Sequence, residues 1–317
     1  MEPSFRAPAG QLVSRRSERF FGREDAPIRE ALLTEAIVEI ERGSGGRSLG
    51  FRITLADGTR GYFKPAQTFN AMRWQSEIAA YHLDRELGLG RVAPVVGRAI
   101  PYDELVEAAR GDGRIDELRP DEDGFLRGAF VWWVPEPLVP ARLPPGWERW
   151  LLIEGEPAAV TPFQRPGQYR RGRTAPPADE APVPDREDRA AELSDMIVFD
   201  YLAHNLDRWG TRNTNVRTVG EGGPLMFLDN AGSFVLRSPR VPLMDLRLAA
   251  VQRFRRSTID AVRRFDVDRF AARLAADPLA PELDERQLAN LEVRRAHLLA
   301  HVDALVEEHG EDAVFPW

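Results

Sequence analysis

The chain has 317 residues, 43% of them hydrophobic and 29% charged, which is enough to bury a large core in one domain or two lobes. Its formal net charge is -7, and its basic residues are spread along the chain, so we expect neither a nucleic-acid nor a membrane partner. The absence of cysteine excludes disulfides and thiolate chemistry. No signal-peptide pattern opens the chain, and no apolar run approaches the roughly 20 residues of a membrane helix. These observations predict a cytoplasmic protein.

Residues 1–36 are predicted to form an N-terminal extension, and residues 37–135 a small lobe with an antiparallel sheet. The first three strands of the sheet are expected at residues 37–40, 49–55 and 60–64. Alternating apolar and polar residues indicate the second strand, and Asp57-Gly58 is a strong hairpin signal before the third.

A helix is predicted from about Asn70 to Leu87, because Trp74, Ile78 and Tyr81 fall on one helical face. Residues 128–134 are apolar and rich in β-forming side chains. We expect them to form an edge strand that leads into a hinge.

Residues 136–185 are predicted to hold this hinge and a surface insertion rich in proline and arginine. The remaining residues, 186–317, indicate a larger and mainly helical lobe. Its pattern begins with a helix at about 186–204, continues with a hairpin strand at 225–228, and ends in a long amphipathic helix.

The turn Gly43-Ser44-Gly45-Gly46 lies between two predicted strands. Backbone amides without side chains can approach phosphate oxygens closely, so this turn is a candidate phosphate-binding loop. A merely flexible hairpin loop is the alternative. It is not a Walker loop, because no Gly-Lys-Ser/Thr follows and a strand comes next.

Lys64 ends the third predicted strand, where its ammonium group could contact the phosphates of a nucleotide. The alternative is a strand-end lysine that reaches out to water. Glu77 lies on the face of the predicted helix that should pack inward, where a carboxylate is costly unless it is paired. Lys64 is its candidate partner, and an exposed position at the edge of the apolar face is the alternative.

Two polar segments of the second half supply the groups that phosphotransfer needs. Asp207 stands in a polar loop that also holds Asn213 and Asn215, and Asp229 follows the predicted strand at 225–228. One carboxylate can orient an attacking hydroxyl, and a second carboxylate with an amide oxygen can hold Mg²⁺. The alternative is that both segments are ordinary polar turns. Because the glycine turn, Lys64 and Glu77 precede them in the chain, the phosphotransfer interpretation is preferred.

The segments Phe199–Arg208 and Phe227–Gly232 resemble the Four-jointed and casein-kinase-like kinases of the secretory pathway. The helical segment Ser76–Pro94 is also similar to HipA-like and phosphatidylinositol kinases. This resemblance extends from about residue 38 to residue 234, with the insertion unmatched. It implies an α+β fold of two lobes, of the atypical protein-kinase-like type, with ATP between the lobes.

The resemblance also implies a role for each candidate. Lys64 would contact the phosphates, Glu77 would position Lys64, Asp207 would be the catalytic aspartate, and Asp229 would bind Mg²⁺ or Mn²⁺. The second metal ligand would be Asn215 or Asn213.

These kinases of the secretory pathway are disulfide-bonded, so a chain without cysteine points to a bacterial, cytoplasmic relative. We expect an ATP-dependent kinase that transfers the γ-phosphate to a hydroxyl acceptor, and a hydroxyl of a protein Ser/Thr or of a sugar would fit. A small-molecule kinase, an AMP transferase on the same fold and a nucleotide-binding pseudokinase scaffold are the alternatives.

Overall fold

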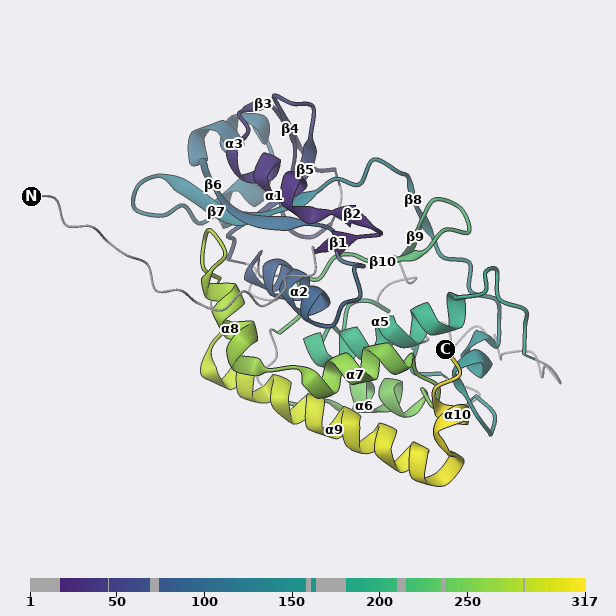
Figure 1. Ribbon diagram of the computed structural model, residues 1–317. Helices are drawn as coiled ribbons and strands as arrows, with labels where there is room; N and C mark the ends of the chain where they lie inside the picture. Colours follow the sequence, from purple (N-terminus) through teal and green to yellow (C-terminus); the bar gives the residue numbers. More distant parts are fainter. Residues whose placement is uncertain are drawn as a thin grey trace, which may run out of the picture.

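The computed structural model describes residues 18–44, 46–68, 74–157, 161–163, 181–209, 215–234, 238–281 and 283–317. These residues form two lobes, a small one built on a sheet and a larger one built mainly from helices (Figure 1). The α+β fold predicted from the sequence is confirmed.

The main sheet of the small lobe is antiparallel, with the strand order β3-β4-β5-β7-β6. Its strands are β3 (Ile37–Arg42), β4 (Phe51–Leu55), β5 (Arg60–Pro65), β6 (Val95–Pro101) and β7 (Phe125–Trp132). The first three lie where the sequence predicts them. The predicted edge strand at 128–134 is wrong, because β6 pairs with the outer side of β7 and places it inside the sheet.

Smaller elements surround this sheet: β1 (Arg19–Phe20), β2 (Arg23–Glu24), α1 (Asp25–Thr34), α3 (Tyr102–Ala108) and the 3-10 helix η1 (Gly113–Glu117). Helix α1 packs against β6 and β7. Its Leu32 is fully buried in the core that Phe51, Phe63 and Phe130 build on one face of the sheet. The boundaries predicted at residues 36, 135 and 185 stay predictions.

Helix α2 (Trp74–Glu86) lies between the sheet and the helices of the large lobe (Figure 1). It contacts β6 and β7 above and α5 and α8 below, and every residue from Ser76 to Asp84 is buried. The helix ends near Gly88, whose φ of 67° is a backbone conformation that glycine adopts without strain. A buried helix of this kind can present a carboxylate to the space between the lobes.

The large lobe holds β8 (Leu138–Pro140), the 3-10 helix η2 (Trp147–Leu151), α5 (Arg189–Ala203), β9 (Val216–Val219), β10 (Leu225–Phe227), α6 (Pro242–Ala249), α7 (Arg256–Arg264), α8 (Val267–Ala275), α9 (Glu285–His309) and α10 (Glu311–Val314). Strands β10, β9 and β8 form a small antiparallel sheet in that order. None of the helices within the described residues is both long and apolar enough to cross a membrane.

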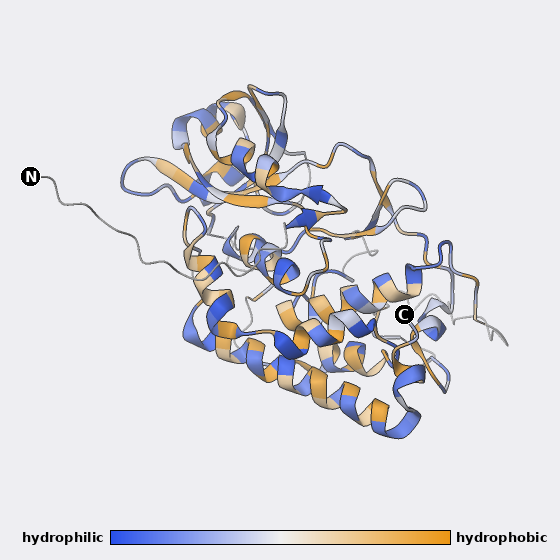
Figure 2. Cartoon of the chain, viewed as in Figure 1, coloured by the Kyte–Doolittle hydropathy of each residue, from blue (hydrophilic) through white to orange (hydrophobic). Residues whose placement is uncertain are grey.

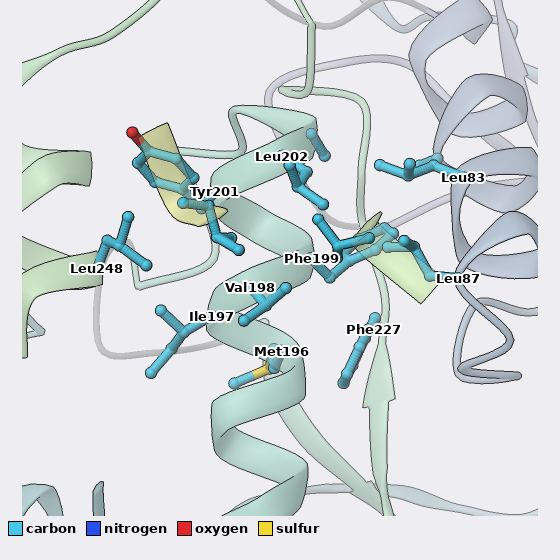
Figure 3. Packing of buried hydrophobic residues seen from close by; sticks show 14 of the residues in the cluster. Leu83, Leu87, Met196, Ile197, Val198, Phe199, Tyr201, Leu202, Phe227 and Leu248 are labelled. Atoms are coloured by element: carbon cyan, nitrogen blue, oxygen red, sulfur yellow. The ribbon is translucent and has the colours of Figure 1, made fainter. Parts of the chain in front are cut away.

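Helix α5 is the centre of the large lobe, since all of its residues are buried. Its apolar side chains pack against Leu83 of α2 and Leu87, which directly follows α2, and against Phe227 of β10 and Leu248 of α6 (Figure 3). Helix α9 covers the lobe from below and carries both polar and apolar residues, as expected of a surface helix (Figure 2). This packing holds the described residues that directly follow α5, since Leu206 and Trp209 contact the same core.

Candidate active site

A cavity of about 970 Å³ lies between the two lobes. Its walls come from the loop 46–50, strand β5, helix α2, the connection 131–138 and the segments around β9 and β10. Its volume suits a ligand of the size of a nucleotide.

Lys64 projects from β5 into this cavity, where it pairs with two carboxylates. Its Nζ donates to Glu77 of α2 and, at 2.7 Å, to Oδ1 of Asp229, which follows β10. Glu77 is 3% exposed, and its Oε1 also accepts the backbone N–H of Asn230 at 3.0 Å. The structure therefore brings together three residues that lie up to 165 positions apart in the sequence.

The charges of this cluster support one another. Burial alone would lower the pKa of Lys64, but the carboxylates of Asp229 and Glu77 more than offset burial and raise that pKa. The Lys64 charge in turn lowers the pKa of Asp229 against the opposing effect of burial. Lys64 and Asp229 are both charged at neutral pH.

Asp229 is the carboxylate of the cluster that is open to the cavity, with 40% of its side chain exposed. Its φ of 56° is unusual for a residue other than glycine and indicates a backbone held in place by its surroundings. A hydrogen bond from the Asn215 side chain also lowers its pKa. The carboxylate and amide oxygens of this pair are ligands that fit Mg²⁺ or Mn²⁺. Asn213, the other predicted ligand, lies outside the described residues.

Asp207 is exposed and lines the same cavity. Its backbone N–H donates to the Oδ1 of buried Asn205 at 3.1 Å, which fixes the start of the loop. A Cβ placed on Gly232 would stand 3.5 Å from the Cβ of Asp207, so the turn after Asp229 packs directly against the Asp207 loop.

Arg208, for which no sequence pattern predicted a role, holds these two loops together. It is fully buried, and its Nη2 donates to Oδ1 of Asp200 at 3.0 Å and to Oδ1 of Asn230 at 2.7 Å. It also donates to the carbonyl oxygen of Leu228. Asp200 is the one charged residue in the otherwise apolar run from Met196 to Ala203, and this was the signal in the sequence that could have revealed the buried ion pair.

The glycine turn contributes less to the cavity than the sequence suggested. Of the described residues, Gly46 lines the cavity and Gly43 and Ser44 do not, while Gly45 lies outside the described residues. A Cβ on Gly43 would stand 2.6 Å from the Tyr62 hydroxyl oxygen, so Gly43 is small because it makes room for that ring. The described part of the loop that faces the cavity is residues 46–50.

The other end of the cavity is mostly apolar, and no sequence motif predicted it. Its lining includes Val92, Ala93, Val131, Trp132, Val134, Leu138, Met226 and Leu228. Phe20 of β1 packs behind several of these side chains and supports them. An apolar end next to a charged end is the arrangement that a flat heteroaromatic base with attached phosphates would need.

Comparison with known proteins gives a family match for residues 178–314, to the family described as Golgi casein kinase, C-terminal, Fam20. Glycosaminoglycan xylosylkinase of Danio rerio is 27% identical over 337 residues, which cover 91% of this chain and 77% of the relative. Extracellular serine/threonine protein kinase FAM20C of Homo sapiens is 24% identical over 334 residues, which cover 91% of this chain and 56% of the relative.

The cytoplasmic location predicted from the sequence is wrong, because the matching family is named for the Golgi and the relative FAM20C for the extracellular space. The absence of cysteine shows only that the fold needs no disulfide, and it does not assign a compartment. The bacterial origin stays a prediction.

The fold gives a further similarity. A solved structure described as the Golgi casein kinase with Mn/ADP bound matches with a TM-score of 0.67 and 20% identity, covering 92% of this chain and 78% of the other. The chain therefore has the two-lobed fold of these kinases. The chain is therefore similar in both sequence and fold to the Golgi casein-kinase-like kinases of the Fam20 family.

Proposed function

We propose that the chain is an ATP-dependent, metal-dependent kinase that transfers the γ-phosphate of ATP to a hydroxyl acceptor. The observation that carries the proposal is the convergence of Lys64, Glu77 and Asp229 at the charged end of the cavity, with Asp207 beside them. This is the set of groups that phosphoryl transfer requires. The sequence similarity to named kinases supports the same reaction.

Lys64 and Glu77 bind and position the nucleotide phosphates. The Lys64 ammonium group supplies a positive charge at the base of the cavity, where burial strengthens its attraction for phosphate oxygens. Glu77 holds that ammonium group in place and is itself fixed by the backbone of Asn230. The adenine ring occupies the apolar end of the cavity.

Asp229 and Asn215 hold the divalent metal ion. Asp229 has the exposure and the orientation toward the cavity that a metal ligand needs, whereas Glu77 is buried and already paired. The metal ion, when bound, neutralises negative charge that builds up on the phosphates.

Asp207 orients the acceptor hydroxyl and accepts its proton as the hydroxyl oxygen attacks the γ-phosphorus. The bond between the γ-phosphorus and the oxygen that bridges the β- and γ-phosphates breaks, and ADP leaves. Its exposure at the cavity lets an acceptor reach it from solvent. The contacts that Arg208 and Asn205 make keep its loop at a fixed place relative to Asp229. Such positioning is a large part of catalysis in phosphoryl transfer.

The acceptor is a hydroxyl of a glycan or of a protein serine or threonine, the two classes that the names of the relatives indicate. The test incubates the chain and Mn²⁺ with γ-labelled or α-labelled ATP and either a xylose-containing glycan or an acidic serine peptide. Transfer of the γ-label to either acceptor supports the proposal. Transfer of the α-label would instead indicate AMP transfer, and nucleotide binding without any transfer would indicate a pseudokinase.

A further inference from the structure

The loop 46–50 lines the cavity, and its Gly50 packs against Tyr62, which lies two residues before Lys64 on β5. This loop is tied to a part of the chain that does not reach the cavity itself. Arg114 of η1 donates from its Nη1 to the carbonyl oxygens of Gly46 at 3.2 Å and of Ser48 at 3.1 Å. A side chain outside the nucleotide cavity thus sets the position of two residues that line it.

Arg114 is itself held by Asp112. The Nε and Nη2 of Arg114 donate to the two carboxylate oxygens of Asp112 at 3.0 and 2.7 Å, and the Asp112 pKa is well below its usual range because of these hydrogen bonds. The side chains are 24% and 8% exposed. A bidentate pair of this kind fixes the plane of the guanidinium group, so its remaining donors have a set direction.

Two further contacts hold the same loop. Gln67 forms a two-way pair with the backbone of Leu49, whose N–H donates to Oε1 and whose carbonyl oxygen accepts from Nε2, both at 2.8 Å. Arg47 makes a bidentate ion pair with Glu117 at 2.8 and 2.7 Å. The loop is therefore attached on both sides to groups outside it.

We propose that Arg114 and Gln67 are positioning residues that hold the loop 46–50 in the conformation that receives the nucleotide phosphates. This inference rests on the proposed function, because it assigns the phosphates to the Lys64 end of the cavity. A loop held in its bound conformation loses less conformational entropy when the ligand arrives, and this strengthens binding. None of the residues that line the apolar end of the cavity makes one of these contacts.

The test compares two probes, Mn²⁺-ADP and adenosine, by isothermal titration calorimetry. Adenosine has no phosphates, so its affinity reports only the apolar end. In Arg114→Ala, the Kd for Mn²⁺-ADP should rise about tenfold, a loss of the size that one or two hydrogen bonds give, while the Kd for adenosine stays unchanged. Arg119→Ala is the matched control, because Arg119 also donates from Nη1 to two carbonyl oxygens, of Asp116 and Leu118, but not to the loop.

An unchanged Kd for Mn²⁺-ADP in Arg114→Ala overturns the inference, and so does an equal loss of affinity for both probes. If Arg114→Ala does not fold, Gln67→Met gives the same comparison, because it removes both hydrogen bonds to the Leu49 backbone without adding a charge to the cavity that Gln67 lines. Failure of the wild-type chain to bind Mn²⁺-ADP contradicts the proposed function instead, so the two failures are distinguishable.

Discussion

Replacement of Lys64 by arginine keeps the positive charge and changes its shape. In the structure a single nitrogen atom lies between Glu77 and Asp229, at 2.7 Å from the latter. A planar guanidinium group spreads its donors over three nitrogens and cannot place one of them at this point without moving a carboxylate. Lys64→Arg therefore tests whether the reaction needs the geometry of the ammonium group or only its charge.

Each charge-assisted hydrogen bond contributes about 1.5–3 kcal/mol, and we expect Lys64→Arg to lose roughly 2–3 kcal/mol of transition-state stabilisation in all. At 1.36 kcal/mol for each factor of ten, kcat/KM falls about 30- to 160-fold. The assay is the initial rate of γ-phosphate transfer, with thermal unfolding measured in parallel to show that the fold is intact. Arg60→Lys, an exposed exchange on the same strand, is the control and should change neither quantity. A kcat/KM of Lys64→Arg within about threefold of the wild type would refute the reasoning.

Three further predictions concern the framework of the site. Burial lowers the pKa of His204 to about 4, so the folded chain should lose stability as the pH falls from 6.5 towards 4, by up to about 3 kcal/mol. The measurement is urea unfolding at several pH values. His204→Gly, whose glycine suits the φ of 59° at this position, should show a flatter dependence of the unfolding free energy on pH. Asp200→Ala leaves the buried Arg208 without its carboxylate partner and should reduce the free energy of unfolding by about 3–5 kcal/mol. A variant as stable as the wild type would contradict the role assigned to the Arg208–Asp200 ion pair. In Gly50→Ala the new Cβ would stand 2.5 Å from the Tyr62 hydroxyl oxygen, so we expect a loss of about 1–3 kcal/mol in urea unfolding, which Tyr62→Ala in the same chain should partly restore.

The local parts of the fold could be predicted from the sequence. The signals that predicted them are properties of short segments: the alternation along β4, the hairpin signal at Asp57-Gly58 and the apolar face of α2. Each of these elements lies within a few residues of its predicted place. The order of the strands could not be predicted in this way. The insertion of β7 between β5 and β6 depends on which distant segments pair, and no local pattern records that choice.

The candidate site shows the same division. Phosphotransfer limits the residue types and their order in the chain, and this predicted four site residues: Lys64, Glu77, Asp207 and Asp229. The structure places all four at one cavity. One further signal was present in the sequence: Lys64 is the single lysine among 43 basic residues. A chain that uses arginine elsewhere and keeps a lysine at one position indicates a requirement for the ammonium group there.

The supports of the site could not be predicted, because they depend on contacts between segments far apart in the chain. Arg208 meets Asn230 across 22 positions, and Arg114 meets Gly46 across 68. Their spacing follows no helix or strand period. A surface ion pair was an equally good interpretation of both arginines before the fold was known.

The central claim is that Asp229 holds a divalent metal ion against a nucleotide bound beside Lys64. Electron paramagnetic resonance of Mn²⁺ tests it directly, because the signal of free Mn²⁺ falls when the ion is bound. When the wild-type chain is added to a solution of Mn²⁺ and ADP, the free Mn²⁺ signal should fall further than it does with ADP alone. Asp229→Ala should abolish this additional loss of signal, while the affinity of the variant for adenosine stays unchanged. Mn²⁺ binding by Asp229→Ala that equals that of the wild type would contradict the account.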